Sequence, residues 1–171
     1  VGSVEDAIRL GADGVSFHLN LGDEAERHML KELGHIATSA DDWGMPLLAM
    51  VYARGPKVKS EYDPEVVKHC ARLAEELGAD VVKVPYTGNI ETFREVVEGC
   101  AIPVVIAGGP RMENDRDILQ MAHDSILAGG AGLSVGRNIF QAKDPSLLVK
   151  ALHGIVHENQ TVEEALALLE N

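Results

Sequence analysis

A repeated alternation of apolar, strand-like segments with helical segments constrains the fold of this chain more than any other feature. Five apolar segments of strand length begin near positions 14, 46, 80, 103 and 131, and each interval between them holds one segment with helical periodicity. The sequence Leu-Gly-Ala-Asp occurs at 10–13 and again at 77–80, each time between a helical segment and a strand-like one. The pattern predicts an α/β domain built on a parallel sheet. An open doubly wound sheet and part of a (β/α)8 barrel both fit it.

The boundaries of the expected elements follow from periodicity and capping residues. Strands are expected over 14–20, 46–54, 79–85, 103–107 and 131–135. Helices are expected over 3–10, 24–42, 63–77, 90–97 and 115–127, followed by one that opens at Asp144-Pro145 and one with a Thr161–Glu164 capping box. With 46% hydrophobic and 25% charged residues, the whole of 1–171 is expected to form a single domain.

Composition excludes several classes of function. The formal net charge of -12 argues against nucleic acid and anionic membrane surfaces as partners. No apolar run reaches the roughly 18 residues that a membrane span requires, and no signal-type segment is present. Cys70 and Cys100 lack the spacing of a disulfide framework or a zinc site, which favours a reduced, cytoplasmic setting without a metal.

Lys83 is unusual because it lies in the middle of an apolar strand-like run, 79–85. Alternation places it on one face with Val81 and Pro85, so the amine has apolar neighbours. Desolvation disfavours the charged form and lowers the pKa, which makes a lysine able to form a Schiff base with a ketone. A lysine at a sheet edge that only reaches solvent is the structural alternative.

Polar residues and glycines gather at the carboxyl ends of the expected strands, where parallel α/β folds carry their active residues. In chain order these are His18 and Asn20, Tyr52 and Arg54, Lys83 and Tyr86, Gly108 and Gly109, and Gly136 and Arg137. Glycines after two consecutive strands let backbone N–H groups approach a phosphate, and an arginine adds positive charge. One such glycine alone usually marks only a turn, but the ordered pair behind a strand lysine favours a phosphate site.

Several of these segments together resemble the archaeal-type class I aldolase family, over nearly the whole chain. The matching segments are Ser16-Phe17-His18-Leu19-Asn20, Tyr52-Ala53-Arg54-Gly55, Val82-Lys83, Ala107-Gly108-Gly109-Pro110 and Val135-Gly136-Arg137-Asn138. The segment at 16–20 favours the branch of that family that makes a heptulosonate for aromatic amino acid biosynthesis. The fructose-1,6-bisphosphate aldolase branch is the nearest alternative.

The resemblance implies a (β/α)8 barrel of which this chain holds about strands four to eight, so the barrel is expected to be incomplete at its N-terminus. It makes Lys83 the Schiff-base lysine and Tyr52 the acid/base residue, with Gly108, Gly109, Gly136 and Arg137 around the substrate phosphate. The implied reaction transfers a three-carbon unit from a deoxy-ketohexose phosphate to aspartate semialdehyde, without metal or organic cofactor. The family's first-strand aspartate has no counterpart here, and the less polar Val84-Pro85 departs from the expected pocket wall.

Two interpretations from other classes remain open at this stage. A phosphate-binding barrel that holds flavin mononucleotide also uses glycines and an arginine after its last strands. A non-catalytic remnant that binds a phosphosugar or a partner subunit would keep the phosphate-binding residues but would not catalyse a reaction. Five strands leave two unpaired parallel edges, which favour association, and the full-length protein is expected to be a homo-oligomer.

Overall fold

The computed structural model describes residues 2–169 and contains one five-stranded, wholly parallel sheet. The strands lie side by side in chain order: β1 (Val15–Leu21), β2 (Leu47–Ala53), β3 (Val81–Pro85), β4 (Val104–Ala107) and β5 (Gly132–Ser134). Each strand pairs with the next one in sequence, because every connection returns the chain one place further along the sheet. The strands at the edges of this sheet are β1 and β5. The predicted parallel α/β architecture is confirmed.

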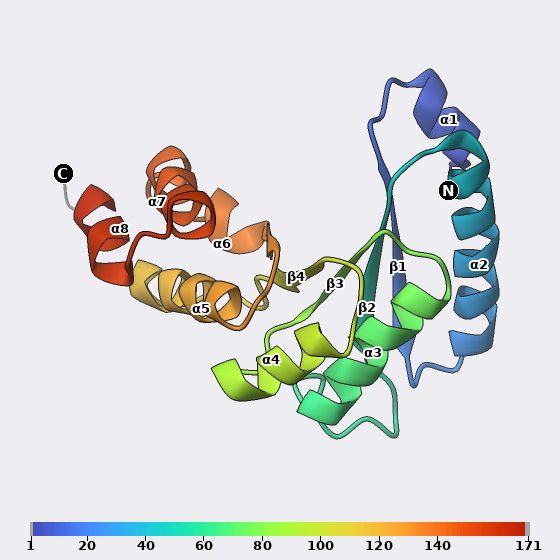
Figure 1. Ribbon diagram of the computed structural model, residues 1–171, viewed down its shortest axis with the longest axis horizontal. Helices are drawn as coiled ribbons and strands as arrows, with labels where there is room; N and C mark the ends of the chain where they lie inside the picture. The colour runs from blue at the N-terminus through green and yellow to red at the C-terminus, as the bar shows by residue number, and fades with distance from the viewer. Residues whose placement is uncertain (1, 170–171) are drawn as a thin grey trace.

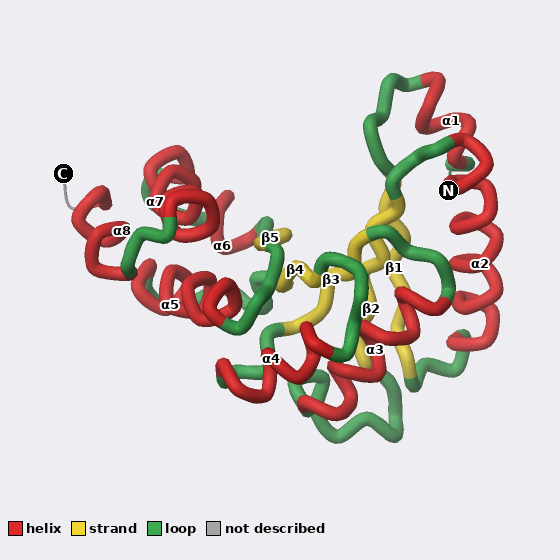
Figure 2. The backbone as a smooth tube through the Cα atoms, viewed as in Figure 1, coloured by secondary structure: helices red, strands yellow, loops and turns green. Residues whose placement is uncertain are grey.

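The helices lie outside a curved sheet. They are α1 (Val4–Arg9), α2 (Glu26–Trp43), α3 (Pro64–Glu76), α4 (Ile90–Glu98), α5 (Asp115–Leu127), α6 (Arg137–Phe140), α7 (Pro145–Glu158) and α8 (Val162–Leu169). Figure 1 shows the elements arranged as an arc, with the two ends of the chain at its opposite ends. In Figure 2 the strands lie along the inner side of that arc and the helices along its outer side.

Side chains alternate between two different faces of the sheet. On the helix-covered face, Leu19, Val51 and Ile106 are each 0% exposed. On the opposite face, His18 is exposed, and Tyr52 and Lys83 are partly exposed. Alternation follows from the two-residue period of a strand, and it confirms the prediction that Lys83 and Val81 share a face opposite to that of Val82 and Val84.

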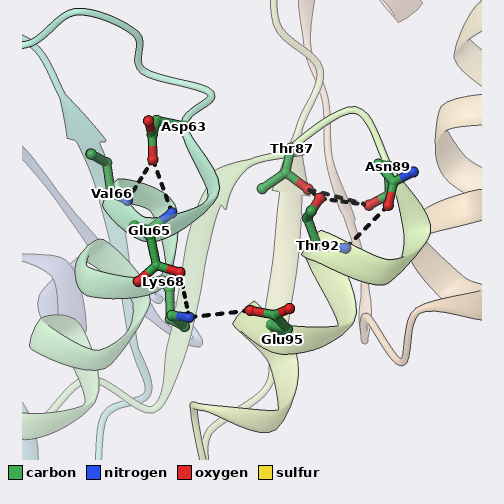
Figure 3. A network of polar contacts seen from close by, with 8 residues as sticks. All are labelled: Asp63, Glu65, Val66, Lys68, Thr87, Asn89, Thr92 and Glu95. Atoms are coloured by element: carbon green, nitrogen blue, oxygen red, sulfur yellow. Dashed lines mark hydrogen bonds and ion pairs between the residues drawn. The ribbon is translucent and has the colours of Figure 1, made fainter.

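Side-chain caps fix the starts of α3 and α4, the helices that follow β2 and β3 (Figure 3). The carboxylate of Asp63 accepts hydrogen bonds from the N–H groups of Glu65 and Val66, at 3.0 and 3.4 Å. Asn89 caps α4 in the same way, and this side chain satisfies N–H groups that have no partner within the helix. Lys68 joins the two helices by bridging Glu65 on α3 and Glu95 on α4.

The expected elements agree with the observed ones to within about two residues at each boundary, which is the usual uncertainty of element ends. The capping box of the last helix is confirmed, since Glu164 N donates to Thr161 Oγ1 and Thr161 N donates to the Glu164 carboxylate. The short helix α6 was not predicted, since no element was assigned to the segment between the last strand and Asp144. Within residues 2–169, no helix combines the length and apolar character needed to cross a bilayer.

Candidate active site

A cavity of about 460 Å³ lies at the carboxyl ends of β2, β3, β4 and β5. Its wall contains three cationic side chains and one carboxylate, although the chain as a whole carries a formal charge of -12. These four residues are Arg54, Lys83, Arg137 and Glu61. The local excess of positive charge suits an anionic ligand.

Lys83 lies on β3 between Met50 of β2 and Val105 of β4 in the register of the sheet. Among the described residues, no carboxylate lies within ion-pair distance of its amine. Burial lowers the pKa of Lys83 below its ordinary value, because the charged form loses part of its hydration. The amine of Lys83 therefore becomes neutral at a lower pH than that of an ordinary lysine. The side chain lines the cavity.

Tyr52 reaches the same cavity from β2 and contacts two polar neighbours. The guanidinium carbon of Arg54 lies 4.4 Å from the centre of the Tyr52 ring, and the ring of His18 lies at 5.3 Å between centroids. Burial raises the pKa of Tyr52, and the charge of Arg54 opposes that rise. The hydroxyl is therefore protonated near neutral pH and able to donate a proton to a developing alkoxide.

The three cavity glycines lack side chains for different physical reasons. A Cβ on Gly108 would lie 2.5 Å from Cγ1 of Val135, so packing excludes a side chain there. Gly109 has a φ of +62°, a left-handed backbone that favours glycine. Gly136 has neither constraint, since the nearest atom to its Cβ position is a Phe140 ring carbon at 4.0 Å. The absence of a side chain at Gly136 leaves room for a ligand to approach the backbone.

Hydrogen bonds hold the two glycine segments against each other. Arg137 donates to the carbonyl of Gly109 at 3.1 Å. Asn138 is buried and donates to the carbonyls of Gly108 and Pro110, at 2.8 and 3.1 Å, while its own carbonyl accepts from the N–H of Met112 at 2.8 Å. Within residues 2–169, the N–H groups of Gly109 and Gly136 have no hydrogen-bond acceptor, so both are free to bind a ligand.

Residues 1–142 match the sequence profile of the DeoC/LacD family aldolases. The chain belongs to this aldolase family. The resemblance inferred from the strand-end residues is thereby confirmed, and the match favours an aldolase over the flavin-binding barrel.

Two curated relatives and one solved structure illustrate the similarity of this aldolase chain to known proteins. It is 48% identical over 166 residues to 2-amino-3,7-dideoxy-D-threo-hept-6-ulosonate synthase of Halobacterium salinarum, covering 97% of this chain and 62% of that protein. It is 43% identical over 161 residues to 2-amino-4,5-dihydroxy-6-oxo-7-(phosphonooxy)heptanoate synthase of Streptomyces griseus, covering 94% of this chain and 59% of that protein.

The solved structure is an archaeal fructose-1,6-bisphosphate aldolase with its catalytic Lys covalently bound to the carbinolamine intermediate of the substrate. The TM-score is 0.87 at 37% identity, and the match covers 90% of this chain and 62% of that one. The aldolase chain thus spans about three fifths of the length of the relatives that it matches.

Most of the residues predicted to form the site lie around one cavity of the aldolase chain. Those that line it are Tyr52, Arg54, Lys83, Tyr86, Gly108, Gly109, Gly136 and Arg137. His18 and Asn20 do not line it; they lie on neighbouring β1, where His18 Nε2 and Asn20 Oδ1 are 3.2 Å apart. The hydroxyl of Tyr86 is buried and has no hydrogen-bond partner within residues 2–169, and its ring packs edge-on against Phe93.

Four polar residues of the site escaped the sequence-based prediction. Glu61 and Tyr62 line the cavity from the loop between β2 and α3, Ser134 lines it from β5, and Asn138 joins the glycine segments by hydrogen bonds. The nearby Lys57 and Lys59 were expected to be solvated, and both are exposed. The signal for Glu61 and Tyr62 was weak, because loop residues carry no periodicity that orients them. Asn138 could have been noticed as an amide directly after Gly136-Arg137.

Proposed function

We propose that this chain carries the Schiff-base lysine and the phosphate-binding residues of a transaldolase that makes 2-amino-3,7-dideoxy-D-threo-hept-6-ulosonate. Its substrates are a deoxy-ketohexose phosphate and L-aspartate semialdehyde. One observation carries the proposal: the desolvated amine of Lys83 shares a cavity with Arg137 and with two glycine N–H groups that lack an acceptor. Imine chemistry and phosphate recognition both need these features, and within one cavity they suit a phosphorylated ketone.

The reaction follows from the chemistry of these side chains. The neutral amine of Lys83 attacks the ketone carbon, and loss of water leaves a protonated imine that withdraws electrons from the bond between the α and β carbons. An acid/base residue from the upstream part of the protein takes the proton of the β-hydroxyl, the α–β bond breaks, and an aldehyde leaves while an enamine remains on Lys83. The enamine carbon then attacks the aldehyde of aspartate semialdehyde, Tyr52 donates its proton to the new alkoxide, and the proton held by the upstream residue returns to Tyr52. Hydrolysis of the imine releases the product and restores the amine.

The names of the relatives support this choice of product. Both curated relatives are named for seven-carbon 2-amino acids with a carbonyl at carbon 6. A ketone at that position is the group that a lysine imine would activate, and the solved relative has its catalytic Lys in a carbinolamine, the adduct that precedes an imine. Fructose-1,6-bisphosphate aldolase is the second candidate function, because that solved relative carries this name at 37% identity.

We further propose that the five strand–helix units form about strands four to eight of a (β/α)8 barrel. The face of the sheet that carries Lys83 has no helices over it, and β1 and β5 each lack a neighbour on one side within the described residues. Upstream strands of a longer protein would pair with both edges and enclose that face. The acid that completes the acid/base machinery would come from that upstream part.

Borohydride trapping of the full-length protein tests the lysine. Reduction in the presence of the ketose phosphate should add the mass of the reduced substrate to the peptide that contains Lys83, and Lys83→Ala should abolish both the adduct and the activity. Lys31→Ala, an exposed position on α2, is the matched control and should behave as the parent protein does. An adduct on another lysine, or an active Lys83→Ala variant, would refute the proposal.

Product analysis separates the two candidate functions. The full-length protein is supplied with the deoxy-ketohexose phosphate and aspartate semialdehyde in one reaction, and with fructose 1,6-bisphosphate in another. A seven-carbon amino acid product from the first supports the transaldolase. Triose phosphates from the second, without a product from the first, would identify a fructose-bisphosphate aldolase.

A further inference from the structure

We propose that Tyr62, on the loop between β2 and α3, donates a hydrogen bond to the phosphate group of the substrate. It would be a further substrate-binding residue, reaching the glycine segments after β4 and β5 from across the cavity. This inference rests on one part of the proposed function, namely that the ligand of this cavity carries a phosphate group.

The position of the Tyr62 hydroxyl relative to Gly109 is the main evidence. A Cβ built on Gly109 would lie 3.8 Å from that hydroxyl oxygen, and apart from Gly109 and its chain neighbours no other described heavy atom comes within 4 Å. The space beside the Gly109 backbone is therefore open and bounded by one polar atom. A ligand oxygen bound there could accept from the Tyr62 hydroxyl at about 2.7 Å, an ordinary length for such a bond.

Contacts on both sides of Tyr62 fix the loop that carries it. The preceding residue, Glu61, accepts a hydrogen bond from Nε of Arg54 at 2.6 Å, which ties the loop to the end of β2. The following residue, Asp63, caps α3. The N–H of Tyr62 itself donates to Oγ of Ser60 at 3.2 Å. The phenol is thus presented to the cavity from a backbone anchored before and after it, which lowers the entropy lost when the ligand binds.

The electrostatic surroundings keep the hydroxyl protonated. Burial raises the pKa of Tyr62 above its ordinary value, and the adjacent carboxylate of Glu61 raises it further, while Arg54 and Arg137 act in the opposite direction. A protonated phenol is a donor to a phosphate oxygen, and a bond to a charged acceptor is stronger than one between neutral groups. Tyr62, Arg137 and the Gly109 N–H would then supply donors from three separate segments.

A packing role does not account for Tyr62. The side chain is 40% exposed, and it is absent from both clusters of buried residues that form the core. Tyr86 in the same cavity wall differs, because its ring packs against the core and its buried hydroxyl has no hydrogen-bond partner among the described residues. Removal of the Tyr62 hydroxyl should therefore cost little core packing.

The test compares Tyr62→Phe with Thr38→Val, which removes an exposed hydroxyl on α2 outside the cavity wall, in the full-length protein. We expect Tyr62→Phe to raise the KM for the phosphorylated ketose about tenfold, the cost of one hydrogen bond to a charged group, while kcat and the KM for the unphosphorylated aldehyde change less than about twofold. Inorganic phosphate, titrated directly by calorimetry, should bind about tenfold more weakly to Tyr62→Phe. Thr38→Val should match the parent protein in both measurements.

The outcomes separate this inference from the proposed function. Phosphate binding that is equally strong in the parent protein and in Tyr62→Phe overturns the role of Tyr62, even if borohydride traps Lys83. Weaker phosphate binding in Tyr62→Phe supports that role, even if no adduct forms on Lys83 and the aldolase proposal fails. Equal weakening in Tyr62→Phe and Thr38→Val also overturns it, because the loss of a hydroxyl far from the cavity would then have the same effect.

Discussion

The two faces of the parallel sheet carry different kinds of residues, although the same strands supply both. On the helix-covered face, Val82 and Val84 of β3 are each 0% exposed and belong to the main core cluster. On the other face, Lys83 lies between them in sequence, is partly exposed and opens onto the cavity. The fold is therefore stabilised on one face, which leaves the alternate positions of the same strands free for chemistry.

This division predicts that substitutions on the two faces affect different properties. Changes on the open face should lower activity with little effect on stability. Changes on the helix-covered face should lower the free energy of unfolding and leave the activity of each folded molecule nearly intact.

The largest effect is expected from Tyr52→Phe on the open face. Loss of the hydroxyl removes the proposed proton donor, and kcat of the full-length protein should fall about 10²- to 10⁴-fold. The ring and its contacts with His18 and Arg54 remain, so the urea-unfolding free energy should stay within about 0.5 kcal/mol of the parent value. Equal losses of activity and stability would contradict the separation of the two faces.

A matched pair of valines on β3 tests the helix-covered face. Val82→Ala removes fully buried methyl groups and should lower the free energy of unfolding by about 2 kcal/mol. Val81 is partly exposed, so Val81→Ala should lower the free energy of unfolding by less than about 1 kcal/mol. Urea unfolding of the 171-residue chain measures both.

The same pair tests the barrel proposal. In a longer protein whose barrel encloses the open face, Val81→Ala should cost nearly as much as Val82→Ala, because both side chains are then buried. An unchanged difference between the two variants would argue that the open face stays uncovered.

Asn138→Ala should affect both stability and ligand binding, because this buried residue holds the glycine segments of the cavity wall. The change leaves the Gly108 and Pro110 carbonyls and the Met112 N–H without their partner, at a cost of about 1–3 kcal/mol in unfolding free energy. Loosening of the glycine segments should also weaken the binding of inorganic phosphate. Asn114→Ala, which removes only the cap of α5, serves as a control that loses stability without losing phosphate affinity.

The smallest expected effect concerns pH. The pKa of Lys83 is lowered in the folded protein, so the unfolded chain binds this proton more tightly, and protonation favours unfolding. The free energy of unfolding should therefore rise as pH increases from the lowered pKa toward the ordinary 10.5. Lys83→Met should be more stable than the parent protein at pH 7 by less than about 1 kcal/mol, because the side chain is partly solvated, and the gap should close near pH 10.5.

Exposed Lys31→Met should leave the pH dependence unchanged and is the control. A gap between Lys83→Met and the parent protein that widens with rising pH would contradict the direction of the Lys83 shift.

The sequence by itself determined the parallel sheet, the alternation that puts Lys83 and Val82 on opposite faces, and half of the residues that line the cavity. Periodicity of two in the strands, helix caps such as Asp63 and the order of the strand ends carry this information locally. The alternation around Lys83 was therefore readable before any contact was known, as was the approach of Gly109 and Gly136 at neighbouring strand ends.

Only the tertiary structure decided which polar residues meet across segments distant in the chain. Arg54 forms an ion pair with Glu61, the residue before Tyr62, and the Tyr62 hydroxyl lies near Gly109. Asn138 donates hydrogen bonds to carbonyls 30 and 28 residues earlier in the sequence, those of Gly108 and Pro110. The positions of His18 and Tyr86 also depend on packing: the His18 ring lies against Tyr52 beside the cavity, and Tyr86 lines the cavity with its hydroxyl buried. Loop direction and side-chain hydrogen bonds depend on packing between elements, which no local sequence pattern encodes.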